Sequence, residues 1–450
     1  MEEKILQLLE ERRFTEMKAM LSEINPADLV EYLDEIPKSD LLLVFRILPK
    51  ELAAETFVEM DSDMQRHLIS AFSDKELRDM LSELFVDETV DIIEEMPASV
   101  AKRIISQSDP QTRREINQIL AYPDDSAGSM ITTEYVDLKK SLTVADAFKH
   151  IKDTGPDKET IYTAYVTDSR RKLIGVVTAK DLLLSSPEQT IEEVMDENVL
   201  FAYTSDDKET VVQMFDKYDI LALPIVDAEK RLIGIITVDD AIDVIQEEAT
   251  EDIEKMAAIM PSDKTYLKTG VFTTFASRIP WLLFLMLSAT FTGWIITAFE
   301  SALAFETALI AFIPMIMNTG GNSGSQSSVT VIRALSLGDI EFKDSIRVFF
   351  KEFRVSILCG LILAVANYIK ILLLDNLLLG SGISNTIAFV VSLTILATVM
   401  FAKIIGCLLP IGAKKIGLDP TVMASPFITT LVDTVSLLIY FAFASMLLSL

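Results

Sequence analysis

Two groups of polar side chains lie inside apolar segments that are long enough to cross a membrane. The first group follows Met317, and the second surrounds Asp433 in the last apolar run. A carboxylate at membrane depth is costly unless it is hydrated, paired or bound to an ion. Together the two groups predict a path whose oxygen atoms replace or hold the water shell of an ion. The candidate lining residues on these grounds are Asn318, Asn322, Ser325, Gln326 and Asp433.

Simpler explanations compete with an ion path for the same residues. The spacing Gly320-x-x-x-Gly324 is typical of close packing between membrane helices, although packing does not explain the neighbouring amides. Asp433 has a structural alternative, a hydrogen bond to Thr429 or Ser436. Lys403 is the only base at a comparable depth, and nothing in the sequence shows that it faces Asp433.

Carboxylates also gather outside the apolar segments. Acidic side chains crowd the stretch 240–254 at spacings of three and four residues, where like charges destabilise a helix. A divalent cation would offset this repulsion, and carboxylates without nearby His or Cys suit Mg²⁺ or Ca²⁺. A second group, Asp87, Glu88 and Asp91, has a solvent-exposed helix face as its plain alternative.

The first 125 residues predict a solenoid of short helices. Helix-breaking or capping residues recur there at multiples of twelve positions, and only Phe85 is out of step. Helices of two to three turns are too short to be stable alone and must stack on their neighbours. The recurring residues are Asn25, Pro37, Pro49, Asp61, Ser73, Pro97 and Asp109.

Residues 126–245 predict a duplicated α/β unit, with repeats at about 126–186 and 191–245. The segments Tyr165–Leu183 and Pro224–Ile242 align without a gap. This tandem resembles a pair of CBS domains, the regulatory modules named after cystathionine β-synthase. The resemblance implies ATP or another adenine nucleotide at Lys180 and Asp181, whereas helix capping explains Asp181 without a ligand.

The back part of the chain, residues 271–450, predicts five membrane helices, preceded by an acidic connecting helix over 246–270. Lys and Arg follow the second and fourth apolar runs and are missing from the other two loops, which places the N-terminal domains in the cytosol and the C-terminus outside the cell membrane. The expected spans are Ile279 to Phe299, Leu303 to Val331, Val355 to Leu374, Ile387 to Leu409 and Met423 to Leu448.

Composition excludes several classes of function. The net charge of −27 lies almost wholly in residues 1–270, which disfavours a nucleic-acid partner and attracts cations. Cys359 and Cys407 lie in apolar runs and suggest no disulfide framework. His67 and His150 are the only histidines, so the His-Glu-x-x-His motif of intramembrane metalloproteases is absent and no enzyme is expected.

The whole arrangement resembles the MgtE family of magnesium channels and transporters. The specific elements are Gly-Gly-Asn-x-Gly-x-Gln at 320–326 and Pro-x-x-Thr-x-x-x-Asp at 426–433, combined with the acidic solenoid, the CBS pair and the acidic connecting helix. The resemblance implies a Mg²⁺-selective importer that is a homodimer in the lipid bilayer. Its pore would lie on the two-fold axis, with Asp433 of both subunits facing a hydrated Mg²⁺. The motif residues Gly320, Gly321, Pro426 and Thr429 would also line it. Ser325 departs from the family pattern.

The resemblance also implies closure of the pore by cytosolic Mg²⁺ that bridges the solenoid, the CBS pair and the connecting (plug) helix. The implied ligands are Asp87, Glu88, Asp91, Glu209, Asp219, Asp240, Asp243, Glu248, Glu251 and Asp252. Two alternatives stay open, a transporter of Co²⁺, Ni²⁺ or Ca²⁺ and a membrane-anchored metal sensor that conducts nothing. The sequence does not separate a channel from a coupled transporter.

Overall fold

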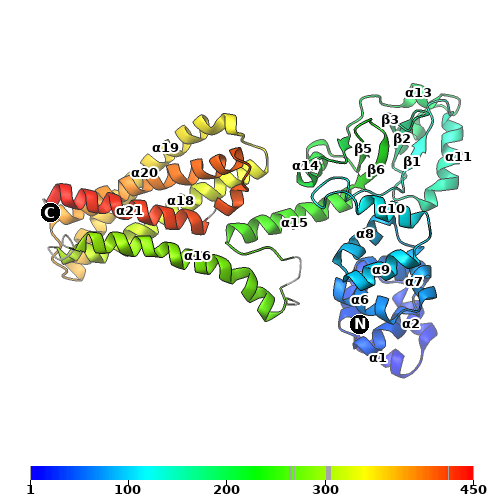
Figure 1. Cartoon of the computed structure of the whole chain (residues 1–450), viewed down its shortest axis with the longest axis horizontal. Coiled ribbons are helices and arrows are strands. Elements are labelled where there is room, and N and C mark those ends of the chain that lie inside the picture. The colour runs from blue at the N-terminus through cyan, green and yellow to red at the C-terminus, as the bar shows by residue number, and fades with distance from the viewer. Residues whose placement is uncertain (1, 263–265, 268, 301–305, 424, 449–450) are drawn as a thin grey trace. The chain divides into compact units, whose positions relative to one another are not determined.

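The computed structural model describes residues 2–262, 266–267, 269–300, 306–423 and 425–448 (Figure 1). The chain divides into two compact units, Met1–Gln246 and Glu247–Leu450. The first unit contains a stack of short helices followed by two small sheets, and the second contains long helices. The predicted fold class is confirmed, apart from the number of membrane spans.

Residues 2–119 form the stack of short helices, and the twelve-residue period marks where most of them begin. Asn25, Asp61 and Ser73 are N-caps whose side chains accept a hydrogen bond from the first turn. Phe85 is an N-cap as well, although its side chain accepts no such bond. The helices are α1 (Glu2–Glu10), α2 (Phe14–Leu21), α3 (Pro26–Asp34), α4 (Lys38–Phe45), α5 (Lys50–Val58), α6 (Ser62–Ala71), α7 (Asp74–Leu81), α8 (Val86–Glu95), α9 (Ala98–Gln107) and α10 (Thr112–Ile119).

The predicted breaker Asp109 lies between α9 and α10, but it is not the N-cap of α10. Helix α10 has Gln111 as its N-cap, because Asp109 uses its side chain to accept the backbone N–H of Gln111 at 2.8 Å in a turn before the helix. In other helices of the stack, the residue before the N-cap has its side chain buried in the core. Ile36, Leu48 and Met60 are all buried in this way, so each short helix is held by the stack and not by its own hydrogen bonds.

The two α/β repeats have the same topology, as their sequence similarity predicts. In each repeat a short first strand pairs in parallel with the second, and the second pairs antiparallel with the third. The first repeat has β1 (Val136–Leu138), α11 (Val144–Thr154), η1 (Gly155–Asp157), β2 (Thr163–Thr167), β3 (Leu173–Thr178) and α12 (Ala179–Leu184). After α13 (Ile191–Val194), the second has β4 (Ala202–Tyr203), α14 (Lys208–Tyr218), β5 (Ala222–Val226), β6 (Leu232–Thr237) and α15 (Val238–Met256).

The helix stack and the second repeat share one hydrophobic core. Phe57 and Val90 of the stack belong to the same buried cluster as Val211, Leu223 and Ala241 of the second repeat. The stack is therefore fixed against the sheets within the first unit, and side chains from both parts can form one site.

The second unit contains four helices that are long and apolar enough to cross a membrane within the described residues. Helix α18 runs beside them and packs on α20 and α21. The expected second span starts among residues 301–305, outside the described residues, so the count of five stays a prediction. The elements are α16 (Val271–Ala298), η2 (Thr307–Phe312), α18 (Ile313–Ser336), η3 (Phe342–Asp344), α19 (Ser345–Lys370), the π-helix η4 (Ile371–Leu378), α20 (Asn385–Lys415), η5 (Pro420–Met423) and α21 (Ser425–Leu448).

Candidate functional site

Helix α18 has a packed face made of small residues. A Cβ atom added at Gly320 would lie 2.6 Å from Cγ2 of Thr398 and 2.7 Å from Oγ of Ser436. A Cβ atom added at Gly406 of α20 would lie 2.3 Å from the carbonyl oxygen of Gly324. The glycines therefore let α18 approach α20 and α21 more closely than any other residue would allow.

The amides of α18 lie on a different face. Asn318, Asn322 and Gln326 follow one another at four-residue spacing and are exposed in the single chain. The side-chain nitrogen of Asn322 donates to Oδ1 of Asn318 at 3.0 Å. Packing thus accounts for the glycines, and a row of amides remains that none of the described helices of the same chain covers.

Asp433 lies on α21 and is half-buried. The hydroxyls considered as its partners are used elsewhere, because Thr429 donates to the carbonyl of Pro426 at 2.9 Å and Ser436 donates to that of Val432 at 2.6 Å. Within the described part of the chain, Asp433 has no hydrogen-bond or ion-pair partner. Lys403 does not face it, since its ammonium donates to Ser327 at 3.3 Å.

Asp433 lies close to the packed face of α18. Thr429, one helical turn before it, lies 3.1 Å (Cγ2) from a Cβ built on Gly321, and Val432 approaches Gly320 and Gly324 in the same way. The residues of the two sequence motifs are therefore neighbours in the structure, although about a hundred residues separate them in the chain.

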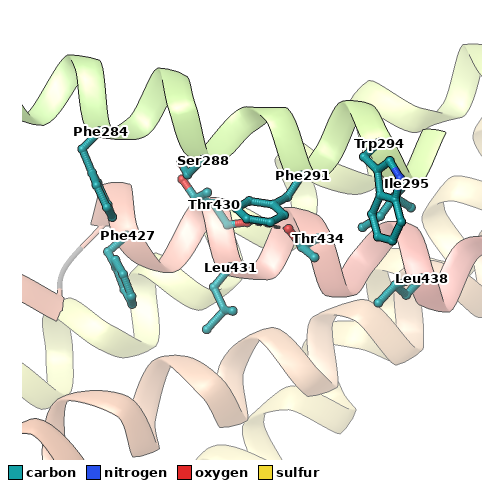
Figure 2. Close-up of a pocket in the computed structure, with 10 residues that line it drawn as sticks. All are labelled: Phe284, Ser288, Phe291, Trp294, Ile295, Phe427, Thr430, Leu431, Thr434 and Leu438. Atoms are coloured by element: carbon teal, nitrogen blue, oxygen red, sulfur yellow. Dashed lines mark hydrogen bonds between the residues drawn. The ribbon is translucent and has the colours of Figure 1, made fainter. Parts of the chain in front are cut away.

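On the side of α21 that faces away from Asp433, α21 and α16 form an uncharged groove (Figure 2). The groove has a volume of about 410 Å³, and its described lining contains hydroxyl and apolar side chains but no charge. Asp433 does not line it, so this groove is not a candidate for holding a cation. The lining residues are Phe284, Ser288, Phe291, Trp294, Ile295, Phe427, Thr430, Leu431, Thr434 and Leu438.

The first unit brings together carboxylates from the helix stack and from both repeats. Asp87, in the first turn of α8, is 7% exposed, and its Oδ1 has no hydrogen-bond partner among the described residues. Burial, followed by the charge of Asp240, raises the pKa of Asp87 well above its usual range. Burial also raises the pKa of Glu88 and of Asp240, although Asp240 accepts a hydrogen bond from Thr237 at 2.6 Å.

Glu159 also belongs to this cluster, although it was not among the predicted ligands. Its Oε2 is buried and unpaired within the described structure. Burial, followed by the charges of Asp240 and Glu88, raises the pKa of Glu159 to about 8. The backbone N–H of Glu159 donates to the carbonyl of Glu134 at 2.8 Å, which brings a further carboxylate near the group. No motif marks either residue, because only the pairing of distant segments places them here.

The electrostatic state of this cluster suits a divalent cation. Two buried carboxyl oxygens have no hydrogen-bond partner among the described residues, and a bound cation would favour the charged form that their raised pKa values disfavour. Hard oxygen ligands of this kind are those that Mg²⁺ and Ca²⁺ take. Among the described residues, no three acidic, His or Cys side chains are close enough to hold one metal ion. Binding would therefore require the carboxylates to move closer together.

The remaining ligands implied by the family resemblance do not lie together in the structure. Glu209 and Asp219 lie at the two ends of α14, about 15 Å apart along a helix of this length, so they do not form one site within a chain. Asp91 and Asp243 are exposed on the surface of the single chain. The carboxyl of Asp243 is nevertheless partly shielded from water, and this shielding, followed by the charge of Asp239, raises its pKa.

The acidic end of α15 contacts the helices of the second unit. Lys255 bridges Glu251 at 2.7 Å and Asp419, in the loop between α20 and α21, at 2.9 Å. Ser336, the last residue of α18, donates to Asp252 at 3.3 Å. Burial is the main cause of a raised pKa for Asp252. Glu248 lies one turn earlier on the same helix.

The predicted nucleotide residues open α12. Thr178 is the N-cap and Asp181 accepts from its backbone N–H at 3.1 Å, which forms a capping box. Lys180 is exposed beside it. The capping explanation therefore holds in the structure, and the nucleotide site stays a prediction.

Three family models match the chain. They describe a divalent cation transporter over residues 313–443, the MgtE intracellular N domain over 24–125, and CBS domains over 127–188 and 191–247. The magnesium transporter MgtE of Thermus thermophilus is 35% identical over 456 residues, covering 100% of this chain and 99% of the relative. The magnesium transporter MgtE of Bacillus subtilis is 32% identical over 443 residues, covering 98% and 96%.

A solved structure is similar to the front part of the chain. The crystal structure of the cytosolic domain of the Mg²⁺ channel MgtE in complex with ATP is 33% identical, with a TM-score of 0.52. It covers 54% of this chain and 100% of that chain. The soluble part of a magnesium transporter matches with 28% identity and the same TM-score of 0.52.

Proposed function

Because the chain belongs to the MgtE family of divalent cation transporters, we propose that it carries Mg²⁺ across the cell membrane into the cytosol. The observation that carries the proposal is Asp433, a half-buried carboxylate on an apolar helix without a partner among the described residues. Such a charge needs water or a cation. Mg²⁺ gives up its water reluctantly, so a hydrated Mg²⁺ beside Asp433 meets both requirements.

The family assignment and the apolar helices make the chain a multi-pass membrane protein with a soluble N-terminal part. Members of the family are transporters rather than enzymes. We further propose that the N-terminal part is cytosolic and that the C-terminus lies outside, as the Lys and Arg of the loops predict.

A homodimer completes the proposed path. The amide row of α18 is exposed in the single chain, and exposed amides are unfavourable against lipid. A second copy related by a two-fold axis would present the same row. Helices α18 and α21 of both copies would then enclose a polar path next to both Asp433 carboxylates.

Closure by cytosolic Mg²⁺ is supported by the carboxylates of the first unit. A cation bound between Asp87, Glu159 and Asp240 would relieve their repulsion and favour one arrangement of the unit over others. Asp240 lies in the first turn of α15, and the last turns of α15 contact α18 and the loop before α21. One continuous helix therefore connects the proposed sensor to the proposed path.

A relative of this chain was solved with ATP, which supports an adenine nucleotide at the CBS pair, with Lys180 and Asp181 as the proposed contacts.

Two alternatives for the main function remain. One is transport of another divalent cation such as Co²⁺, Ni²⁺ or Ca²⁺ along the same path. The other is a metal sensor without transport.

The test is Mg²⁺ entry into liposomes that contain the full-length protein and an internal Mg²⁺ dye. Asp433→Asn keeps the shape and removes the charge, and losing about 1.5–3 kcal/mol of charge-assisted binding should reduce entry about tenfold to a hundredfold. Millimolar Mg²⁺ on the cytosolic face should reduce entry by the wild type. No Mg²⁺ entry by the wild type would favour the sensor, and entry that is indifferent to Asp433 would move the path elsewhere.

A further inference from the structure

A second group of charged side chains is buried in the helices of the second unit, and none of the contacts that hold it together involves Asp433. Lys403 of α20 and Glu352 of α19 have side chains that are only 7% and 12% exposed, with 4.0 Å between Nζ and Oε2. The buried hydroxyl of Ser327, on α18, lies between them. It donates to Oε2 of Glu352 at 2.6 Å and accepts from Nζ of Lys403 at 3.3 Å.

This network joins three helices at one point. Ser327 lies three residues after Gly324, where the backbones of α18 and α20 come so close that no side chain fits between them. A contact between glycines allows close approach, but it has no side chains that fix the depth or the rotation of one helix against the other. The hydroxyl of Ser327 can hydrogen-bond to both Lys403 and Glu352 at only one depth and rotation of α18. Buried polar groups are known to fix register in this way.

The rotation of α18 determines where its amide row points. Gln326 is adjacent to Ser327, and Asn322 lies little more than one turn before it, on the same rigid helix. A change in the rotation or depth of α18 at Ser327 would therefore move Asn322 and Gln326 by a similar amount.

We propose that Lys403 and Glu352 are positioning residues for the ion path, which act through Ser327 to fix the depth and rotation of α18. The inference rests on the proposed function and goes beyond it by assigning a role to charges that lie outside the path. Glu352 is not itself an ion ligand, because one of its oxygens accepts from Ser327 and an ammonium lies beside it. Lys403 does not neutralise Asp433, because it is held by Ser327 and Glu352.

The experiment compares Mg²⁺ and Ca²⁺ entry in the same liposome assay with the full-length protein. The ratio of the two rates reports on how the path is shaped and does not depend on how much protein is folded. Lys403→Met and Glu352→Gln should each lower the ratio about threefold or more, a size typical of coupling between residues in contact. Lys351→Met is the matched control, an exposed lysine next to Glu352, and should leave the ratio unchanged.

Two further variants keep the test decisive if a single change prevents folding. The exchange Lys403→Glu with Glu352→Lys should restore the ratio toward that of the wild type. The pair Lys403→Met with Glu352→Gln leaves no unpaired buried charge and is therefore expected to fold. If this folded pair keeps the wild-type ratio, the positioning role is wrong. If the wild type admits no Mg²⁺, the proposed function fails, and this inference fails with it.

Discussion

Replacing Glu159 with Gln should stabilise the protein when no divalent cation is present. The pKa of Glu159 is raised from 4.5 to about 8 in the folded chain, so the folded protein binds this proton more tightly than the unfolded chain does. The unfavourable charge is absent below pH 4.5, and stability falls as the pH rises from there to about 8. Glu159→Gln removes this loss, because the amide carries no charge at any pH.

The expected gain in stability follows from the raised pKa of Glu159 and from how far its carboxyl is buried. A rise of the pKa from 4.5 to about 8 corresponds to about 5 kcal/mol if it is fully expressed. Glu159 keeps part of its surface in water, and solvent screening reduces such figures strongly, so about 1–2 kcal/mol is expected. For a unit of this size, each kcal/mol shifts the unfolding midpoint by about 2–4 °C, which gives a rise of about 2–8 °C.

The assay is thermal unfolding of the full-length protein in detergent with a chelator, at pH 6 and pH 8.5, and then with added Mg²⁺. Glu159→Gln should raise the midpoint at pH 8.5, flatten its dependence on pH and reduce the stabilisation by Mg²⁺. Glu188→Gln, an exposed acid in the same repeat, is the control. A Glu159→Gln midpoint equal to or below that of the wild type at pH 8.5 would refute the reasoning.

Two other perturbations follow from the contacts of the second unit. Gly406→Ala places a Cβ against the backbone oxygen of Gly324 and should destabilise the protein by about 1–3 kcal/mol. Gly412→Ala on the same helix is the control, because a Cβ there has nothing within 4 Å. Equal thermal unfolding midpoints of the two variants in detergent would contradict the packing described. Lys255→Met breaks the bridge to Asp419, and because both side chains are partly exposed, the pair is worth about 1 kcal/mol. The cytosolic Mg²⁺ concentration that halves Mg²⁺ entry should therefore rise by up to about fivefold. If this concentration is the same in the variant and the wild type, the bridge does not contribute to closure.

Features that depend on neighbours in the sequence were predictable, and features that depend on folding were not. Asn25 and Asp61 cap helices through backbone groups two or three residues away, so a repeating pattern reveals them. Glu159 lies near Asp87 and Asp240 because the helix stack packs on the second repeat, and because the first repeat pairs with the second at Thr132 and Ile235. No local pattern contains that information. The partners of Lys403 stayed hidden for the same reason, since Ser327 and Glu352 come from other helices.

The polar stretch of α18 raised a choice between packing and an ion path, and the structure places the packed glycines and the exposed amides on different faces of the helix. Because Gly320 and Gly324 touch α20 or α21, a loss of transport on replacing either would not identify it as a lining residue. Asn322 is exposed, so Asn322→Ala removes an amide without creating a cavity in the packed face. Its effect on the ratio of Mg²⁺ to Ca²⁺ entry would report on the path alone. An unchanged ratio in that variant would separate the amide row from ion selection, and the proposed path would then depend on Asp433.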